Sequence, residues 1–163
     1  MKINFRKHLL FIVVATTAFM FCHAGCYKND QTETYINNDN GNPNDSTLSK
    51  MKITIGSAVF IVSLNDNPTV RKFKSMLPLT IEMSELNANE KFFYFSSTLP
   101  TDSAPAGTIM AGDLMLYGNN CLVLFYENLN SSYSYTRLGK IENVTGLKKV
   151  LGTGKIIVKF ELQ

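Results

Sequence analysis

Alternating apolar and polar residues dominate the chain beyond residue 51 and predict strands. Leu79, Ile81 and Met83 alternate with polar neighbours, and residues 155–162 repeat the same two-residue period. Such a period turns one face of a strand toward a core and the other toward water. We therefore predict eight strands, at residues 52–55, 58–64, 79–84, 91–95, 114–117, 121–127, 133–141 and 155–162.

Two segments instead carry the spacing of helices. Residues 67–77 begin with Asn-Pro-Thr and stop before Pro78, and residues 144–151 stop at Gly152. About eight strands and two short helices favour a mainly β fold, a closed antiparallel barrel with helices over its open ends. Closure removes the exposed edges of an open sheet. Residues 96–111 show neither pattern, and we predict a loop that covers a cleft.

The first 26 residues have the pattern of a secretory signal. Lys2, Arg6 and Lys7 precede an apolar segment at 9–21, too short for a membrane span of about 20 residues. Ala-Gly-Cys26 follows, and it resembles the lipobox of bacterial lipoproteins. That resemblance implies that Cys26 is lipidated and becomes the new N-terminus. The alternative is an ordinary signal peptide cleaved nearby.

The sequence divides into three parts. We predict a signal peptide at 1–25, a lipidated Cys26 with a flexible Asn-rich tether through residue 50, and one domain at 51–163. The tether has too few apolar residues to offset the entropy of ordering it. We expect an exported protein of the bacterial cell envelope, which its lipid anchors in the outer membrane.

Composition excludes several classes of function. The chain has 16 basic and 13 acidic residues, but three of the basic ones precede Cys26, so the remainder is neutral and has no basic run. We therefore expect no nucleic-acid partner. After cleavage, Cys121 is the one remaining thiol and no histidine remains. That excludes a disulfide within the domain, a His-dependent nucleophile and a thiolate cage, and we predict no metal and no cofactor.

Six stretches of the domain carry a family resemblance. They resemble the bacterial cyclophilin-like domain family, whose members include Bacteroidetes lipoproteins, and the order of elements is similar to the cyclophilin barrel. The resemblance spans nearly all of 51–163 and implies the barrel fold without implying an activity. The stretches are residues 67–69, 76–79, 89–91, 105–109, 112–118 and 133–141.

The catalytic set of true cyclophilins is missing. Those prolyl isomerases use an arginine and a pocket of Phe, Met, Trp and His. Here residues 79–85 contain no arginine, the chain has no tryptophan, and Tyr135 stands where the pocket histidine is expected. The resemblance therefore implies the barrel without its catalytic residues.

Aromatic residues near Arg137 form the candidate ligand site. Arginine beside alternating tyrosines suits anionic or carbonyl ligands. The alternatives are an ion pair of Arg137 with Glu127 or Glu142, and tyrosines that only pack their rings. Tyr126 is a further candidate for a cleft. The predicted ligand-binding residues are Arg137, Tyr135, Tyr133, Tyr94, Tyr117 and Phe125.

Other polar residues favour structural roles. We interpret Glu82, Glu85 and Glu90 as a solvated face rather than as paired catalytic carboxylates. Asp113 follows a glycine at the start of a strand and is expected to cap a turn. Cys121 lies among aliphatic residues, so a buried, unreactive thiol is expected.

Three functions remain open. The leading hypothesis is a non-catalytic envelope lipoprotein whose domain binds a small molecule or peptide. The second is a divergent prolyl isomerase, with Arg137 as donor beside a pocket of Phe93, Phe95, Met115 and Phe125. The third is a structural subunit of an envelope complex.

Overall fold

The structure, a computed structural model, describes residues 50–163. The predicted signal peptide, Cys26 and the tether up to residue 49 lie outside this range. No helix within it is long and apolar enough to cross a membrane. The elements are β1 (Lys50–Ile55), β2 (Ala58–Leu64), α2 (Pro68–Lys74), β3 (Leu79–Leu86), β4 (Glu90–Tyr94), β5 (Ala104–Ile109), β6 (Asp113–Tyr117), β7 (Cys121–Phe125), β8 (Leu129–Ile141), α3 (Leu147–Leu151) and β9 (Ile156–Leu162).

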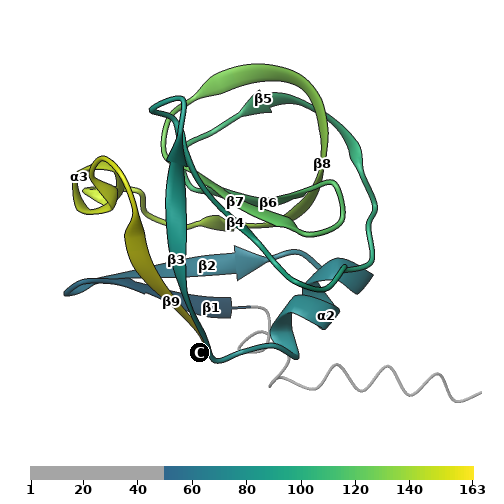
Figure 1. Cartoon of the computed structure of the whole chain (residues 1–163), viewed down its shortest axis with the longest axis horizontal. Helices are drawn as coiled ribbons and strands as arrows, with labels where there is room; N and C mark the ends of the chain where they lie inside the picture. The colour runs from purple at the N-terminus through teal and green to yellow at the C-terminus, as the bar shows by residue number, and fades with distance from the viewer. Residues whose placement is uncertain (1–49) are drawn as a thin grey trace, which may run out of the picture. The chain divides into compact units, whose positions relative to one another are not determined.

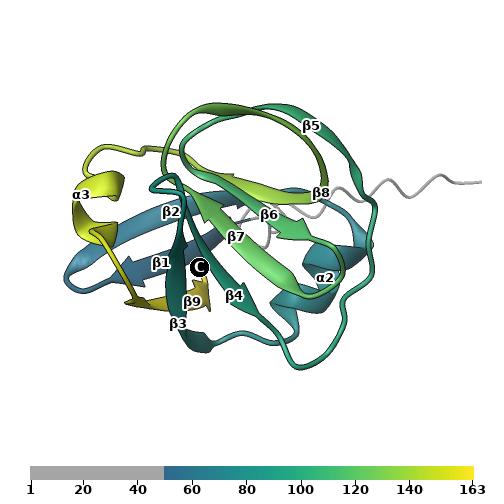
Figure 2. The same cartoon turned by 45° about the horizontal axis from the view of Figure 1, so that its top comes forward.

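The strands form one antiparallel sheet that closes on itself (Figures 1 and 2). Their order is β2-β1-β9-β3-β4-β7-β6-β8-β5, and a further pairing of β2 with β8 completes a ring of eight. The ninth strand, β5, pairs with β8 outside this ring. The predicted mainly β, closed antiparallel fold with two short helices is therefore confirmed.

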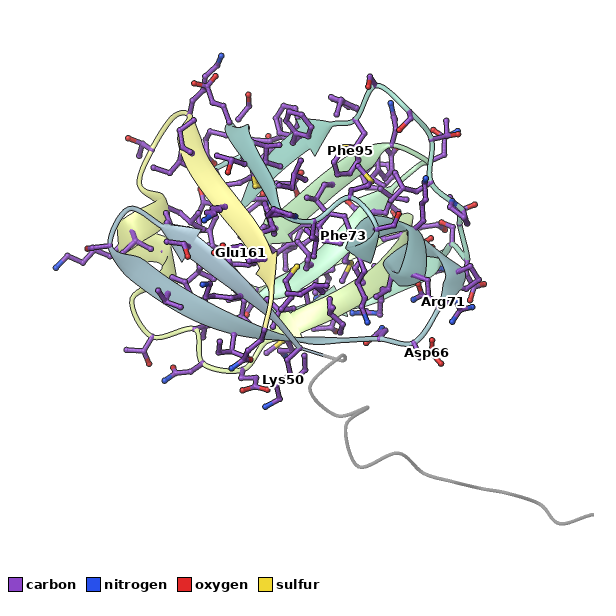
Figure 3. All side chains as sticks on the ribbon, turned by 90° about the horizontal axis from the view of Figure 1, so that it is seen from below. Lys50, Asp66, Arg71, Phe73, Phe95 and Glu161 are labelled. Carbon is purple, nitrogen blue, oxygen red and sulfur yellow. The ribbon has the colours of Figure 1, made fainter. Side chains whose placement is uncertain are left out.

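Helix α2 packs its apolar side over one end of the barrel core. The Phe73 ring lies 5.9 Å from that of Phe160 and 6.2 Å from that of Phe95, measured between centroids. Figure 3 shows Phe73 and Phe95 on the inside and the charged Arg71 at the periphery. Asn67 caps the helix by accepting a hydrogen bond from the Val70 N–H at 2.8 Å.

This helix ends earlier than the sequence predicts, at Lys74 rather than residue 77. The N–H of Met76 bonds the carbonyl of Phe73, and the N–H of Leu77 bonds that of Lys74. Bonds to the third residue back tighten the backbone into a last 3₁₀-type turn before Pro78. The sequence predicted that the helix stops at the proline, but the α-helix ends at Lys74 and the 3₁₀-type turn fills the residues before Pro78.

The predicted loop at 96–111 is partly wrong, because it contains strand β5. The segment Ala104-Pro105-Ala106-Gly107 has no apolar alternation, since β5 pairs only with β8 and leaves most of its side chains exposed. Proline is compatible with such an edge strand. Strand β8 also begins earlier than predicted, at Leu129. Together, β5 and residues 129–135 of β8 form a ribbon that we call the roof.

A second apolar core lies beneath the roof. It gathers buried residues of β5, β6, β7 and β8 on the outer face of the barrel wall, including Met115, Val123 and Phe125. In Figure 1 the roof curves over β4, β6 and β7, which we call the floor. The floor strands β6 and β7 are therefore buried on both faces, which explains their unbroken apolar sequences.

A buried charge network lies on the other side of β4. Lys91 is fully buried, and its Nζ contacts the Glu85 carboxylate and donates to the carbonyls of Gly152 at 3.1 Å and Gly154 at 2.6 Å. The Tyr126 hydroxyl donates to the same carboxylate at 2.6 Å. Glu85 is therefore not part of a solvated face, so that prediction was wrong. Tyr126 belongs to the core inside the barrel and also borders a second hollow beside Ala88 and Val144, apart from the other candidate tyrosines.

Gly139 lies where the barrel closes. It pairs with Leu64 of β2 on one side and Leu114 of β6 on the other. A Cβ added there would lie 2.4 Å from the Ser63 carbonyl oxygen and 3.1 Å from the Leu64 Cα. The close approach of two backbones therefore requires glycine at this position.

Candidate functional site

A cavity of about 560 Å³ opens between the roof and the floor. It is bordered by outward-facing residues of β4, β6 and β7, by the roof, and by the turn that joins β3 to β4. This volume falls within the range of small-molecule sites, about 300–1,000 Å³. It is the best candidate for a functional site in the described part of the chain.

Four of the predicted ligand-binding tyrosines meet at this cavity. Strand register places Tyr94, Cys121, Tyr117 and Tyr135 in one row across β4, β7, β6 and β8. The Tyr117 ring lies 5.3 Å from that of Tyr135 and 6.0 Å from that of Tyr133.

These tyrosines differ in exposure. Tyr94 and Tyr133 are 59% and 64% exposed, whereas Tyr135 is buried. Burial, with the charge of Glu90, raises the pKa of Tyr135 to about 12, so its hydroxyl stays protonated. The cavity therefore has an exposed aromatic rim and a buried aromatic wall.

The remaining two predicted residues lie outside the cavity lining. Phe125 is fully buried in the second core, with its ring 5.7 Å from that of Tyr135, so it supports the wall from behind. Arg137 donates to the carbonyl of Ala106 at 2.9 Å and contacts the Asp113 carboxylate at 3.3 Å. It thereby ties β5 to β6.

The predicted ion-pair partners of Arg137 were wrong. Glu127 pairs with Lys148 and Glu142 with Lys50, whereas Arg137 uses Asp113. Asp113 also accepts the N–H of Met110 at 3.0 Å, which confirms that it caps a turn.

Glu90 is a site residue that the sequence prediction missed. It is only 8% exposed and lines the cavity, so its assignment to a solvated face was wrong. Burial raises the pKa of its carboxyl group, and the charge of nearby Glu85 raises it further. Within residues 50–163 no group donates a hydrogen bond to it. One signal was present: Glu90 shares a strand face with Phe92 and Tyr94.

Cys121 also lines the cavity, and the prediction that its thiol is buried is confirmed. The thiol is buried, and burial raises its pKa. A raised pKa disfavours the thiolate, which is the reactive form. Within the described residues, no three His, Cys, Asp or Glu side chains are grouped as metal ligands.

The apolar pocket suggested for a prolyl isomerase does not form. Phe93 and Phe95 belong to the core inside the barrel, whereas Met115 and Phe125 belong to the second core under the roof. These two pairs lie on opposite faces of the wall, so they cannot grip one proline ring together.

Comparison with known proteins agrees with this fold. The model of a family described as cyclophilin-like matches residues 53–161. The solution structure of a hypothetical protein from Archaeoglobus fulgidus is similar, with a TM-score of 0.54 and 20% identity. The match covers 72% of this chain and 97% of that one, and at this identity it shows the fold alone. No curated protein matches the chain.

Proposed function

We propose, from the premise that this chain belongs to the cyclophilin-like family, that its domain is a non-catalytic binding module. The domain holds a small molecule or part of a peptide in the cavity under the roof. In the same proposal, the lipidated Cys26 anchors the exported protein in the bacterial cell envelope, at the outer membrane.

One observation carries the binding proposal: a cavity of about 560 Å³ with an aromatic rim and a buried, unpaired carboxyl group. Exposed aromatic clusters on a domain surface mark interaction sites. An unpaired buried carboxylate is costly for a fold, so its presence favours a role in binding over a role in stability. Arg137 is engaged with Asp113 and the β5 backbone, which counts against its role as the donor of an isomerase, and it is not part of the lining of the proposed binding cavity.

Binding is tested with a fragment library screened by NMR against the full chain. We expect saturable ligands whose affinity falls about tenfold in Tyr117→Ala, because the variant loses the central ring of the cavity. Val59→Ala, on the exposed face of β2, is the control and should bind as the parent does.

The same samples test catalysis. We expect exchange of Xaa-Pro peptides at the uncatalysed rate. Exchange well above that rate, abolished in Arg137→Ala, would make the protein an isomerase and contradict the proposal. The absence of any fragment affected by Tyr117→Ala would remove the cavity as the binding site.

The membrane anchor is tested by expression with the native leader in a bacterial host. Cys26→Ser should abolish incorporation of an alkyne-labelled palmitate and release the protein from the outer-membrane fraction. Cys22→Ser is the matched control, because it changes a cysteine within the predicted signal. Label retained in Cys26→Ser and lost in Cys22→Ser would place the lipid on the other cysteine. No label in the parent protein would refute the anchor.

A further inference from the structure

Charge in the cavity is one-sided. Glu90 is the single charged residue in its lining, and no lysine, arginine or histidine of the described chain is part of it. The other charge that acts on Glu90 is the carboxylate of Glu85, which is engaged with Lys91 behind the floor. An anionic ligand would therefore meet repulsion and no basic partner.

The unsatisfied polar group of the cavity is an acceptor. The Glu90 carboxylate receives no hydrogen bond within residues 50–163, although the residue is only 8% exposed. Asn89 also has an Oδ1 without a donor within that range, but this atom is sealed from solvent and so cannot meet a ligand in the cavity. Polar groups of largely buried residues are normally paired, so the carboxylate of Glu90 indicates a missing donor.

Aromatic rings share the cavity lining with Glu90. Phe92 follows Glu90 on the same face of β4, with its ring 5.7 Å from that of Tyr94, and Tyr117 and Tyr135 border the same cavity from β6 and β8. The faces of aromatic rings attract cations, and they also pack against apolar groups. The surroundings of Glu90 thus suit a positive charge on an apolar body.

We propose that the ligand carries a protonated amine, which Glu90 binds while the aromatic residues hold its apolar part. This inference rests on the proposed binding function and specifies the chemistry of its ligand. An N–H-bearing ammonium group supplies both the positive partner and the hydrogen-bond donors that the Glu90 carboxylate lacks. A quaternary ammonium would satisfy only the charge, and a neutral alcohol only one donor.

The test uses three probes of one shape and different charge. They are 2-phenylethylamine, 2-phenylethanol and 3-phenylpropionate, titrated into the full chain and followed by NMR. We expect the amine to bind at least tenfold more tightly than the alcohol, and the carboxylate not to bind. Glu90→Gln should reduce the preference for amine over alcohol to less than twofold, because the amide keeps the shape and removes the charge.

Glu82→Gln is the matched control. Glu82 is an exposed carboxylate on β3 that pairs with Lys155 outside the cavity, so this variant should keep the tenfold preference. Folding is checked by thermal unfolding. Glu90→Gln should melt at or above the temperature of the parent, since it removes an unpaired buried charge.

The source of the amine is separated by a fourth probe, the dipeptide N-acetyl-phenylalanyl-lysinamide. Binding as tight as that of 2-phenylethylamine, with the same loss in Glu90→Gln, would indicate a lysine side chain of a peptide. Much weaker binding would indicate a free amine.

Two outcomes overturn the inference. If the alcohol or the carboxylate binds as well as the amine, or if Glu90→Gln keeps the preference, the cavity is not an ammonium site, and the proposed binding function stands. If no probe and no library fragment binds at the cavity, both proposals fail.

Discussion

Replacing Lys91 with Met should lower the free energy of unfolding by about 3 kcal/mol. The side chain is fully buried, and its ammonium group contacts one carboxylate and two backbone carbonyls. Methionine fills similar space but offers no donor, so Glu85 and the carbonyls of Gly152 and Gly154 lose their partner. We place the loss at the low end for a broken buried pair because the Glu85 side chain is 22% exposed.

Urea unfolding of three variants separates this loss from loss of packing. Lys91→Met/Glu85→Gln should recover part of the stability, because the double variant has no unpaired charge while Tyr126 keeps an acceptor. Lys155→Met breaks an exposed ion pair with Glu82 and should change stability by less than about 0.5 kcal/mol. Equal unfolding midpoints for Lys91→Met and Lys155→Met would show that the buried network contributes nothing.

Acid should reduce the difference in the free energy of unfolding between the parent protein and Lys91→Met. Burial by itself raises the pKa of Glu85, but hydrogen bonds from Lys91 and Tyr126 and the charge of Lys91 outweigh it, so the pKa lies below the ordinary 4.5. A carboxyl group with a lowered pKa stabilises the fold above its ordinary pKa. That contribution disappears as the pH falls through the lowered value. The stability gap should therefore narrow below about pH 4.5, and a constant gap would contradict this account.

Gly139→Ala should also lower the free energy of unfolding by about 3 kcal/mol, because the new methyl group causes steric strain where the barrel closes. The obstacles to the new methyl group include the Ser63 carbonyl oxygen and the Leu64 Cα, which are backbone atoms and cannot rotate away. Strand β8 must therefore move away from β2. Lys140→Ala, at the next residue, is the control, since the Lys140 side chain is 54% exposed.

Thermal unfolding measures the loss of stability in Gly139→Ala, and amide hydrogen exchange shows where in the barrel it occurs. Beside Gly139, the N–H of Asn65 bonds the carbonyl of Leu138 and the N–H of Glu142 bonds that of Ile61, both at 2.9 Å. These two amides should exchange faster in Gly139→Ala, while the amides between β1 and β9 change less. An unchanged melting temperature with unchanged exchange would mean that the closure tolerates a methyl group.

Most of the fold follows from local sequence pattern, as two regions illustrate. Residues 79–84 alternate strictly, and β3 buries Ile81 and Met83 as the alternation predicts. The apolar run of β7 and the Gly-Asn-Asn before it predict a hairpin with β6, which the register confirms. Strand β5 escaped prediction because an edge strand that pairs on one side needs no alternating apolar residues.

The site could be predicted only in part, because burial there depends on distant segments. Tyr94, Tyr117, Tyr133 and Tyr135 were selected for their ring chemistry. Tyr94, Tyr117 and Tyr135 meet because they share one register row across β4, β7, β6 and β8, and Tyr133 contacts Tyr117 from the roof. Glu90 was misassigned because a charged residue ordinarily indicates solvent. The roof that covers it comes from residues 104–109 and 129–135, and no local pattern near residue 90 reports on them.

The roof has a mechanical consequence. Residues 129–134 of β8 pair only with β5, so this part of the sheet is a two-stranded ribbon, whereas the floor belongs to the closed ring. A two-stranded ribbon is marginal by itself and opens at a lower free energy than a closed barrel. The cavity can therefore exchange its contents by local opening of one wall while the barrel stays folded, and the lifetime of a complex depends on how firmly the second core and Arg137 hold that wall.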